Sequence, residues 1–383
     1  MGEIEIFLRQ HAEEGLLRTL RPMACRKEGR ISSNGREYLD LSSNDYLALA
    51  DHPRMAASAR QALDAFGTSA SASRLMSGDL DICHRLEDKT ALFKGKGSAL
   101  VFNTGYQANV GIISALCSRN DCIFSDRLNH ASILDGAKLS GAELIRFRHN
   151  DAGHLKALLE SRRHKFRKAL IVTETIFSMD GDRPPLREIA ALKERYGCEL
   201  MVDEAHATGI FGSGGSGIVE EEGLSEQVDI VMGTFGKALG SFGAYLASTK
   251  SMVDYMVNSC RAFIYSTALP PPVIAANTAA IELIQQEPWR RKRLLELASY
   301  FRNALTSRGF TVKGESQIVP LVVGDTGRAV KLAERLWEKG FWVLPIRPPT
   351  VPQGQARLRF SITLHHDEEM LRRLVDEIVG LGL

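Results

Sequence analysis

The stretch VDIVMGTFGKALGSFGA, residues 228–244, decides how the rest of the chain is interpreted. Its first five residues are apolar or β-branched apart from Asp229, a pattern typical of a short buried strand. A glycine-rich run follows, with one lysine, Lys237, between Phe235 and Phe242. Such a run brings backbone close to a ligand and can strip water from an amine, which lowers the pKa of an ammonium group. Lys237 is therefore a candidate Schiff-base lysine, although a lone loop lysine is more often a solvated charge.

A second segment, ELMVDEAHATG at residues 199–209, supplies a partner for that lysine. Leu200, Met201 and Val202 indicate another buried strand, which places Asp203 at its carboxyl end and His206 three residues later. Pyridoxal phosphate needs an acid beside its pyridine nitrogen, because a protonated ring draws electrons from the substrate. An Asp and a His at this spacing also fit an ion pair or a metal site. Only together with the lysine segment do they predict a pyridoxal-phosphate site.

Three segments carry a family resemblance: MVDEAHATGIFGSGGSG (201–217), MGTFGKALGSFGA (232–244) and IRPPTVPQGQARLRF (346–360). They resemble the α-oxoamine synthases, fold-type I pyridoxal-phosphate enzymes that join an amino acid to an acyl thioester with loss of carbon dioxide. The likeness runs from about residue 17 to the C-terminus. It implies an α/β fold-type I PLP-dependent transferase, in which a large domain with a mostly parallel sheet between helices precedes a smaller C-terminal α+β domain.

The 383 residues are enough for more than one domain. We expect an N-terminal helix and hairpin segment over residues 1–44, a large cofactor-binding domain over 45–272 and a small domain over 273–383. Apolar spacing predicts a helix over residues 4–20 that Pro22 closes, then a turn at Gly35. In the small domain, the pattern predicts a helix over 328–339 that ends at Gly340, and a strand over 341–346.

Strand and helix patterns alternate at least five times in the large domain, which favours a mostly parallel sheet with helices on both faces. Sites in such sheets lie beyond the carboxyl ends of the strands. Predicted strands at residues 99–102, 122–126 and 169–177 lead to an NTGY turn, to LNHAS and to SMDGD. A helix that begins after the NTGY turn could present free N–H groups to a phosphate.

The resemblance assigns roles to residues at these strand ends. It implies that Lys237, His130 and Asp203 are catalytic, with His130 stacked on the cofactor ring and also in contact with substrate. The cofactor-binding residues that it implies are Gly105, Tyr106, His130, Ser178, Asp203, His206, Thr234, Lys237, Ser266 and Thr267. Without the resemblance, His130 is better explained as an ordinary half-buried histidine and Ser178 as a turn-capping serine.

Substrate contacts are expected outside the cofactor site. The phrase SSNDYLALA (42–50) resembles a family segment that brings Asn44 near the substrate, and the tail segment contributes Arg347 and Thr350. An arginine fork suits the carboxylate of an amino acid. Arg18 lies where the family has a substrate-contacting arginine, although an arginine there is often only surface charge. The loop GTSASASRLMSG (67–78) contains less glycine than the family pattern, which leaves its role open.

Composition narrows the class of protein further. The chain has 48 basic and 46 acidic side chains, a balance that does not favour nucleic acid or an anionic membrane as partner. Its six cysteines form no CxxC pair, so we expect reduced thiols and no metal site. The first twenty residues lack the apolar run of an export signal, and no later stretch is long enough to span a membrane. We therefore expect a cytoplasmic enzyme.

The family resemblance implies that the substrates are L-alanine and a pimeloyl thioester, carried by coenzyme A or by a carrier protein, in biotin biosynthesis. The resemblance also implies a homodimer with shared active sites, in which Ser266 and Thr267 reach the phosphate in the partner's site. Another member of the family, using glycine with acetyl- or succinyl-CoA or serine with a long acyl-CoA, is the nearer alternative. A nucleotide-binding or non-catalytic α/β module is the farther one, and the lack of a GxGxxG after the first strand disfavours it.

Overall fold

The computed structural model describes residues 2–14 and 16–382. Contacts divide the chain into two compact units. Unit 1 comprises Met1–Ser43, Met179–Gly181 and Arg293–Leu383, and unit 2 comprises Asn44–Ser178 and Asp182–Lys292. The division into three parts at residues 44 and 272 stays a prediction.

Unit 2 is built on a seven-stranded sheet. In spatial order its strands are β4 (Ser98–Phe102), β10 (Ala244–Ser248), β9 (Ile230–Thr234), β8 (Glu199–Asp203), β7 (Ala169–Glu174), β5 (Cys122–Asp126) and β6 (Glu143–Phe147). Neighbours from β9 to β6 pair in parallel, whereas β10 runs antiparallel to both β4 and β9. The predicted mostly parallel sheet is confirmed, and β10 is a strand that our sequence analysis missed.

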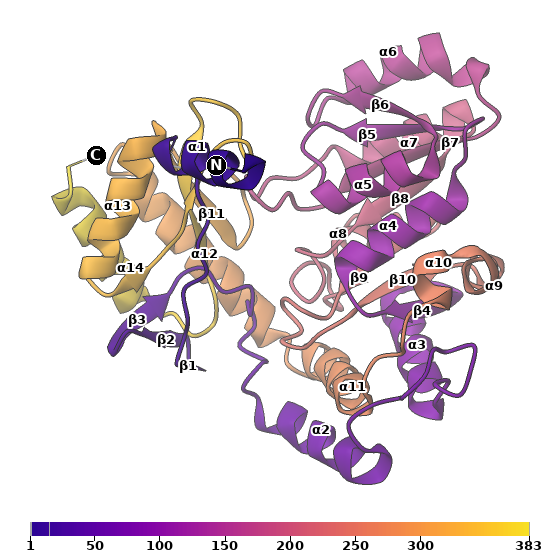
Figure 1. The fold of residues 1–383 in the computed structure, drawn as a ribbon, viewed down its shortest axis with the longest axis horizontal. Coiled ribbons are helices and arrows are strands. Elements are labelled where there is room, and N and C mark those ends of the chain that lie inside the picture. Colours follow the sequence, from indigo (N-terminus) through magenta and orange to yellow (C-terminus); the bar gives the residue numbers. More distant parts are fainter. Residues whose placement is uncertain (1, 15, 383) are drawn as a thin grey trace. The chain divides into compact units, whose positions relative to one another are not determined.

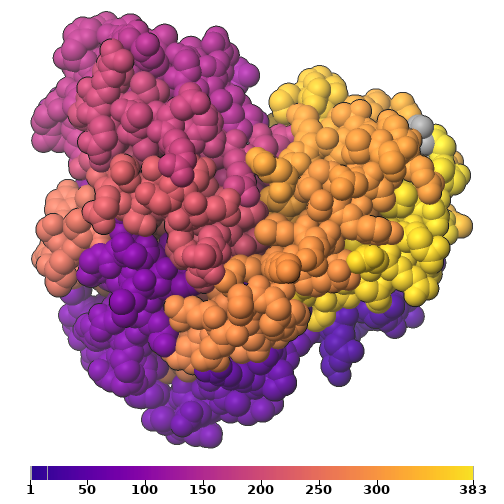
Figure 2. Space-filling model, turned by 180° about the vertical axis from the view of Figure 1, so that it is seen from behind, coloured from indigo at the N-terminus to yellow at the C-terminus, as the bar shows by residue number. Residues whose placement is uncertain are grey.

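Helices surround this sheet, and Figure 1 shows α4 to α7 around its strands. The helices of unit 2 are α2 (Pro53–Phe66), α3 (Asp81–Lys94), α4 (Gly105–Leu116), α5 (Ala131–Ser140), α6 (Ala152–Arg162), the 3₁₀ turn η1 (Arg163–Lys165), α7 (Leu186–Tyr196), α8 (Ile218–Glu221), α9 (Lys250–Ser259), α10 (Arg261–Ile264) and α11 (Pro271–Gln286). The apolar spacing of residues 53–66 and 186–196 predicts two of these helices, and α2 and α7 have those bounds. Helix α2 packs along α11, and orange atoms near residue 280 meet violet atoms near residue 60 in the lower part of Figure 2.

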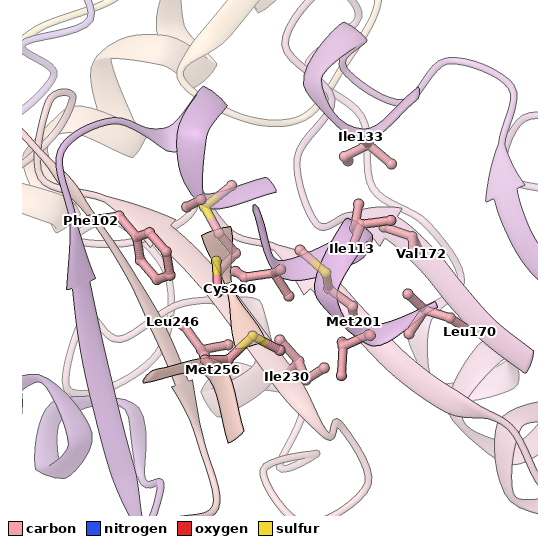
Figure 3. Close-up of a cluster of buried hydrophobic side chains, with 14 of the residues drawn as sticks. Phe102, Ile113, Ile133, Leu170, Val172, Met201, Ile230, Leu246, Met256 and Cys260 are labelled. Carbon is pink, nitrogen blue, oxygen red and sulfur yellow. The ribbon is translucent and has the colours of Figure 1, made fainter. Parts of the chain in front are cut away.

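One apolar cluster ties the sheet to α4, α5 and α9. Phe102, Met201 and Leu246 come from three strands and meet Ile113 and Met256 from two helices (Figure 3). Each of these five side chains is at most 2% exposed. Burying a side chain of this size contributes roughly 1.5–3 kcal/mol, so the cluster fixes the strands whose ends carry the predicted site.

The described residues of unit 1 form two smaller sheets and three whole helices. One sheet has the order β1 (Cys25–Lys27), β2 (Arg30–Ser33), β3 (Arg36–Asp40) and β12 (Phe341–Trp342), and the other has β11 (Ile318–Gly324), β14 (Ala356–Ser361) and β13 (Pro345–Ile346). The helices are α1 (Glu3–Glu13), α13 (Thr326–Glu338) and α14 (Glu368–Gly380), while α12 (Trp289–Thr306) begins in unit 2 and continues into unit 1. The predicted turn at Gly35 joins β2 to β3 as expected.

Two predictions for unit 1 are wrong. The predicted helix over residues 4–20 ends at Glu13, because the N–H groups of Leu16 and Leu17 both donate to the carbonyl of His11, at 2.7 and 2.9 Å, and turn the chain out of helical register. The predicted strand over 341–346 is split: Trp342 pairs with β3, whereas Ile346 pairs with β14. Pro345 lies at this change of sheet, where a residue without an N–H is tolerated.

Candidate functional site

Residues that follow five parallel-running strands of unit 2 gather at one edge of the sheet. Strands β4, β5, β7, β8 and β9 point the same way, so their carboxyl ends share that edge. The predicted residues at these ends are Gly105 and Tyr106 after β4, His130 after β5, Ser178 after β7, Asp203 and His206 at β8, and Thr234 and Lys237 at β9. The site is therefore assembled by topology from segments far apart in sequence.

Asp203 is the last residue of β8 and is only 5% exposed. Its Oδ2 accepts a hydrogen bond from Asn109 Nδ2 at 2.9 Å, and its Oδ1 accepts one from the backbone N–H of Ala205 at 2.8 Å. Asn109, on α4, also donates to Ser132 Oγ at 3.0 Å. Two donors thus orient the carboxylate, and its remaining lone pairs can accept a further N–H.

His130 is the N-cap of α5, and its Nδ1 accepts from the backbone N–H of Ser132 at 3.3 Å. The ring meets the ring of Tyr106 edge-on, with centroids 6.4 Å apart. Partial burial of the ring lowers the pKa of His130. The charge of Asp203 opposes this effect, and the charge of Lys237 lowers the pKa further. A neutral imidazole at neutral pH is suited to stacking on a flat, electron-poor ring.

Lys237 lies in the half-buried turn after β9. The Lys237 carbonyl accepts the N–H of Gly240 at 2.8 Å, and Gly240 has φ +63°. A Cβ on Gly240 would lie 2.4 Å from the backbone nitrogen of Ala50, so only glycine fits there. Thr234 holds the start of the turn: its hydroxyl accepts from Gly236 N–H at 3.0 Å and donates to the Gly243 carbonyl at 2.8 Å.

Glu174 belongs to this cluster and was missed by the sequence analysis. It ends β7 opposite Asp203, is 3% exposed, and its Oε1 accepts the backbone N–H of His130 at 2.6 Å. Burial raises the pKa of Glu174 well above the usual 4.5, the charge of Asp203 adds to this, and Lys237 opposes it. A glutamate inside the apolar run ALIVTETIF was a signal, because a buried strand rarely contains a charge without a function.

A chain of hydrogen bonds connects two other predicted residues. The hydroxyl of Tyr46, a fully buried residue, lies 2.9 Å from Nδ1 of His206 and donates to Asn44 Oδ1 at 3.0 Å. The ring centroids of Tyr46 and His206 are 6.1 Å apart. The structure therefore brings Asn44 and His206 together through a tyrosine that we had not assigned.

Ser266 and Thr267 lie beside the start of α4 in their own chain. Gln107 Nε2 donates to Ser266 Oγ at 2.7 Å, and Asn103 Nδ2 donates to the Thr267 carbonyl at 2.9 Å. Thr267 also forms a β-bridge with Ser73, so the glycine-poor loop 67–78 packs against this segment. That Ser266 and Thr267 contact the phosphate in the partner's site stays a prediction.

Arg18, Arg347 and Thr350 belong to unit 1, where they line one hollow of about 970 Å³. Arg18 Nη2 donates to Thr350 Oγ1 at 3.4 Å, and Arg347 Nη2 donates to the Leu17 carbonyl at 3.2 Å. Apolar side chains that include Phe7 and Trp337 complete the lining. The hollow combines cationic and apolar surface, which suits an acyl chain or amino acid that carries a carboxylate.

No helix within residues 2–14 and 16–382 is both long and apolar enough to cross a membrane. Nor do His, Cys, Asp and Glu side chains there gather in a group that could hold a metal ion.

A carboxyl edge that carries a loop lysine, a buried aspartate and a histidine at the start of a helix is the arrangement expected of a pyridoxal-phosphate site on an α/β sheet. The family model for aminotransferase class I and II matches residues 36–378. The chain belongs to this family of fold-type I enzymes, and the predicted fold class is confirmed.

Individual relatives show which members of this family the chain is similar to. The chain is 48% identical over 372 residues to the 8-amino-7-oxononanoate synthase of Geobacter metallireducens, covering 96% of this chain and 95% of the relative. Its fold is similar to serine palmitoyltransferase from S. paucimobilis with bound PLP–myriocin aldimine, with a TM-score of 0.93, 31% identity, and coverage of 99% of this chain and 96% of that chain. An 8-amino-7-oxononanoate synthase from Francisella tularensis matches with a TM-score of 0.78 and 28% identity, covering 90% and 97%. The resemblance to α-oxoamine synthases is confirmed.

Proposed function

We propose that the chain carries pyridoxal 5'-phosphate on Lys237 and condenses L-alanine with a pimeloyl thioester, with loss of carbon dioxide. This is the reaction of the 8-amino-7-oxononanoate synthases in biotin biosynthesis, a PLP-dependent C-acyltransfer. The observation that carries the proposal is the 48% identity to such a synthase over nearly the whole chain. The cluster of Lys237, Asp203 and His130 supplies the chemistry that the reaction requires.

The residues at the carboxyl edge fit this cofactor. Gly105 opens α4, and a Cβ added there would meet nothing within 4 Å, so the first turn has room for a phosphate against its N–H groups. Tyr106 and Thr234, with Ser266 and Thr267 of one or the other subunit, complete the phosphate contacts in this proposal. Asp203 has spare acceptor capacity for a protonated pyridine nitrogen. Ser178 and His206 bind the phenolic oxygen.

When bound, the cofactor supplies an electron sink that accepts the negative charge left at the α-carbon of the amino acid. Lys237 Nζ anchors the cofactor and then removes the α-proton of alanine, once substrate has taken its place. Asp203 keeps the ring nitrogen protonated. His130, neutral at neutral pH, covers one ring face and orients the substrate without adding a competing positive charge.

Substrate selection is assigned to the arginines and to Asn44. The planar fork of Arg347 matches the carboxylate of alanine, and Thr350 lies in the same hollow. Arg18 receives the distal polar end of the pimeloyl group, and the apolar lining receives its methylenes. Asn44 orients substrate through the hydrogen-bond chain with Tyr46 and His206.

The test is a matrix of amino acids and thioesters, with the product identified by mass. We expect alanine with a pimeloyl thioester, on coenzyme A or acyl carrier protein, to react faster than glycine with acetyl-CoA or serine with palmitoyl-CoA. The alternative, another α-oxoamine synthase such as a glycine C-acetyltransferase or a serine-using enzyme, gains some support from the 0.93 TM-score to serine palmitoyltransferase. Faster turnover of either alternative pair would overturn the choice of substrates and leave the family unchanged.

We also propose a cytoplasmic homodimer in which Ser266 and Thr267 serve the partner's site. Mixed dimers of Lys237→Ala and Thr267→Ala chains test this arrangement. If the two residues act in different composite sites, each mixed dimer keeps one intact site and activity returns. Absence of recovery, in a mixture shown to exchange subunits, would assign Thr267 to the site of its own chain.

A further inference from the structure

His149 lies between two carboxylates, outside the set of residues to which the proposed reaction gives a role. Its Nδ1 is 2.9 Å from Asp126 Oδ1, and its Nε2 is 2.8 Å from Asp182 Oδ2. Asp126 is fully buried and ends β5, while Asp182 follows β7 in the chain. The imidazole thus bridges segments that continue from two neighbouring strands of the sheet.

The two carboxylates favour a charged imidazole. An ionised carboxylate can only accept hydrogen bonds, so each ring nitrogen of His149 must carry a proton, which a neutral ring cannot provide. Burial by itself would lower the pKa of His149, but the hydrogen bonds and charges of Asp126 and Asp182 outweigh it and raise this pKa to about 9. Asn150, whose Nδ2 lies 3.2 Å from Nε2 of His149, and Phe177, whose ring packs against the imidazole, are neutral.

Both aspartates also hold backbone that leads to the cofactor site, Asp126 through its carboxylate and Asp182 through its backbone carbonyl. Asp126 accepts the N–H of Leu128 at 2.8 Å and the N–H of Asn150 at 2.9 Å, which shapes the turn that ends at His130. The carbonyl of Asp182 accepts the N–H of Phe177 at 3.1 Å and so closes the loop that contains Ser178. The ring of Phe177 meets His149 edge-on, with centroids 4.5 Å apart.

We propose that the His149 imidazolium is a positioning residue, which ties the turn before His130 to the loop around Ser178 and so fixes two cofactor contacts at once. The inference rests on the proposed function for the roles of His130 and Ser178, whereas the charged bridge itself does not depend on that function. It follows that loss of one proton from His149 loosens both segments together.

The sign of the pH dependence is defined. A histidine whose pKa is raised on folding stabilises the fold fully below its ordinary value of 6.5, and this stabilisation is lost as pH rises through about 9. Wild-type protein should therefore lose stability over this range relative to a variant that lacks the imidazole. His149→Gln serves as that variant, and His164→Gln, which changes an exposed histidine of η1, is its matched control.

The first experiment is independent of activity and cofactor. Nitrogen-15 NMR of histidine-labelled wild-type protein, with His149 assigned by its loss in His149→Gln, reports the protonation of both ring nitrogens. We expect both to be protonated at pH 7.5 and one proton to leave near pH 9. Asp182→Asn should move this transition to lower pH, because one of the two raising charges is gone. A neutral His149 ring at pH 7.5 would overturn the proposal.

The second experiment measures kcat, KM and melting temperature against pH. His149→Gln should lower kcat for alanine and the pimeloyl thioester about ten- to hundredfold at pH 7.5, with a smaller change in KM, because the contacts are misplaced rather than removed. The melting-temperature deficit should shrink between pH 7 and pH 10, and His164→Gln should match wild type. Full activity in folded His149→Gln, or a deficit that does not change with pH, contradicts the positioning role. If wild type itself turns over no substrate pair, the proposed function fails while the NMR still decides the bridge.

Discussion

The two regions that carry the predicted chemistry are built differently. In unit 2, catalytic candidates occupy strand ends that are fixed by sheet register and by an apolar core, and Asp203 and Glu174 stand opposite one another on paired strands. In unit 1, Arg18 and Arg347 lie on irregular segments. Arg18 donates one hydrogen bond to Thr350 at 3.4 Å, and Arg347 donates one to the carbonyl of Leu17 at 3.2 Å. The comparison indicates that rigid elements position bond-making groups, whereas loops position the groups that select substrate.

The largest effect should come from Lys237, which both anchors the cofactor and moves a proton. A positioned general base contributes roughly 10²–10⁴-fold, so loss of both roles in Lys237→Ala should lower kcat by more than about 10⁴-fold. Borohydride reduction of wild type should fix the cofactor to a peptide that contains Lys237. Lys250→Ala, an exposed lysine of α9, is the control and should behave as wild type. Cofactor found on another lysine would remove the centre of the unit 2 site.

Asp203→Asn should retain the fold and bind cofactor, yet lower kcat roughly 10²–10³-fold, the usual cost of removing a preorganised electrostatic partner. The amide keeps an acceptor for Asn109 but has no charge to stabilise a protonated ring nitrogen. Absorbance spectra would verify cofactor loading, and Asp254→Asn on the surface of α9 is the control. Near-normal turnover would mean that a different acid, with Glu174 the nearest candidate, serves the ring.

Much of the unit 2 site was predictable because sheet topology leaves few alternatives. Buried runs ending at Asp126, Asp203 and Thr234 identify strands, and parallel strands place their carboxyl ends on one edge. Lys237 and Asp203 then act on the same imidazole although 34 positions separate them, because the charges of both shift the pKa of His130. Strand β10 was not predicted, because its apolar segment is short and follows a glycine-rich run. No helix separates it from β9, so the strand–helix alternation that indicates the other strands is absent there.

The residues that were not predicted matter because of hydrogen bonds to residues distant in sequence, and no local sequence motif identifies them. Glu174 is significant because it accepts the N–H of His130, and His149 because two carboxylates distant in sequence face its ring. Neither relation follows from spacing along the chain. In unit 1 the end of the helix predicted over residues 4–20 was wrong for a similar reason: the helix forms as α1 but stops at Glu13, where the N–H groups of Leu16 and Leu17 take the carbonyl of His11.

The arginine hollow should give smaller and more selective effects. Arg347→Ala should raise KM for alanine about ten- to hundredfold, the cost of a lost charge-assisted hydrogen bond, and change kcat less. Arg18→Ala should instead raise KM for the pimeloyl thioester. Deprotonation of alanine, measured as hydrogen exchange at its α-carbon, should be unchanged in this variant. Arg372→Ala on the exposed face of α14 is the control. Equal effects of both variants on both substrates would show that the hollow works as one undivided anion site.

Glu174→Gln should have the smallest effect, and its size distinguishes a neutral hydrogen-bond acceptor from a working carboxylate. Burial and the charge of Asp203 raise the pKa of Glu174 well above 4.5, which favours its neutral acid form, and glutamine is a close substitute for that form. The amide oxygen can still accept the N–H of His130, so kcat should fall less than about threefold, whereas Glu174→Leu leaves that N–H unpaired at a cost of roughly 1–3 kcal/mol.

The pH dependence of stability checks the same assignment. A carboxyl whose pKa is raised on folding stabilises the fold fully below its ordinary 4.5 and loses that stabilisation as pH rises. Glutamine does not titrate, so the melting temperature of Glu174→Gln should rise relative to wild type as pH increases above 4.5. A hundredfold loss of kcat in Glu174→Gln, with a melting-temperature difference that is constant with pH, would instead make Glu174 a second ionised carboxylate beside Asp203. The unit 2 site would then depend on a balance of charges that sheet register alone does not supply.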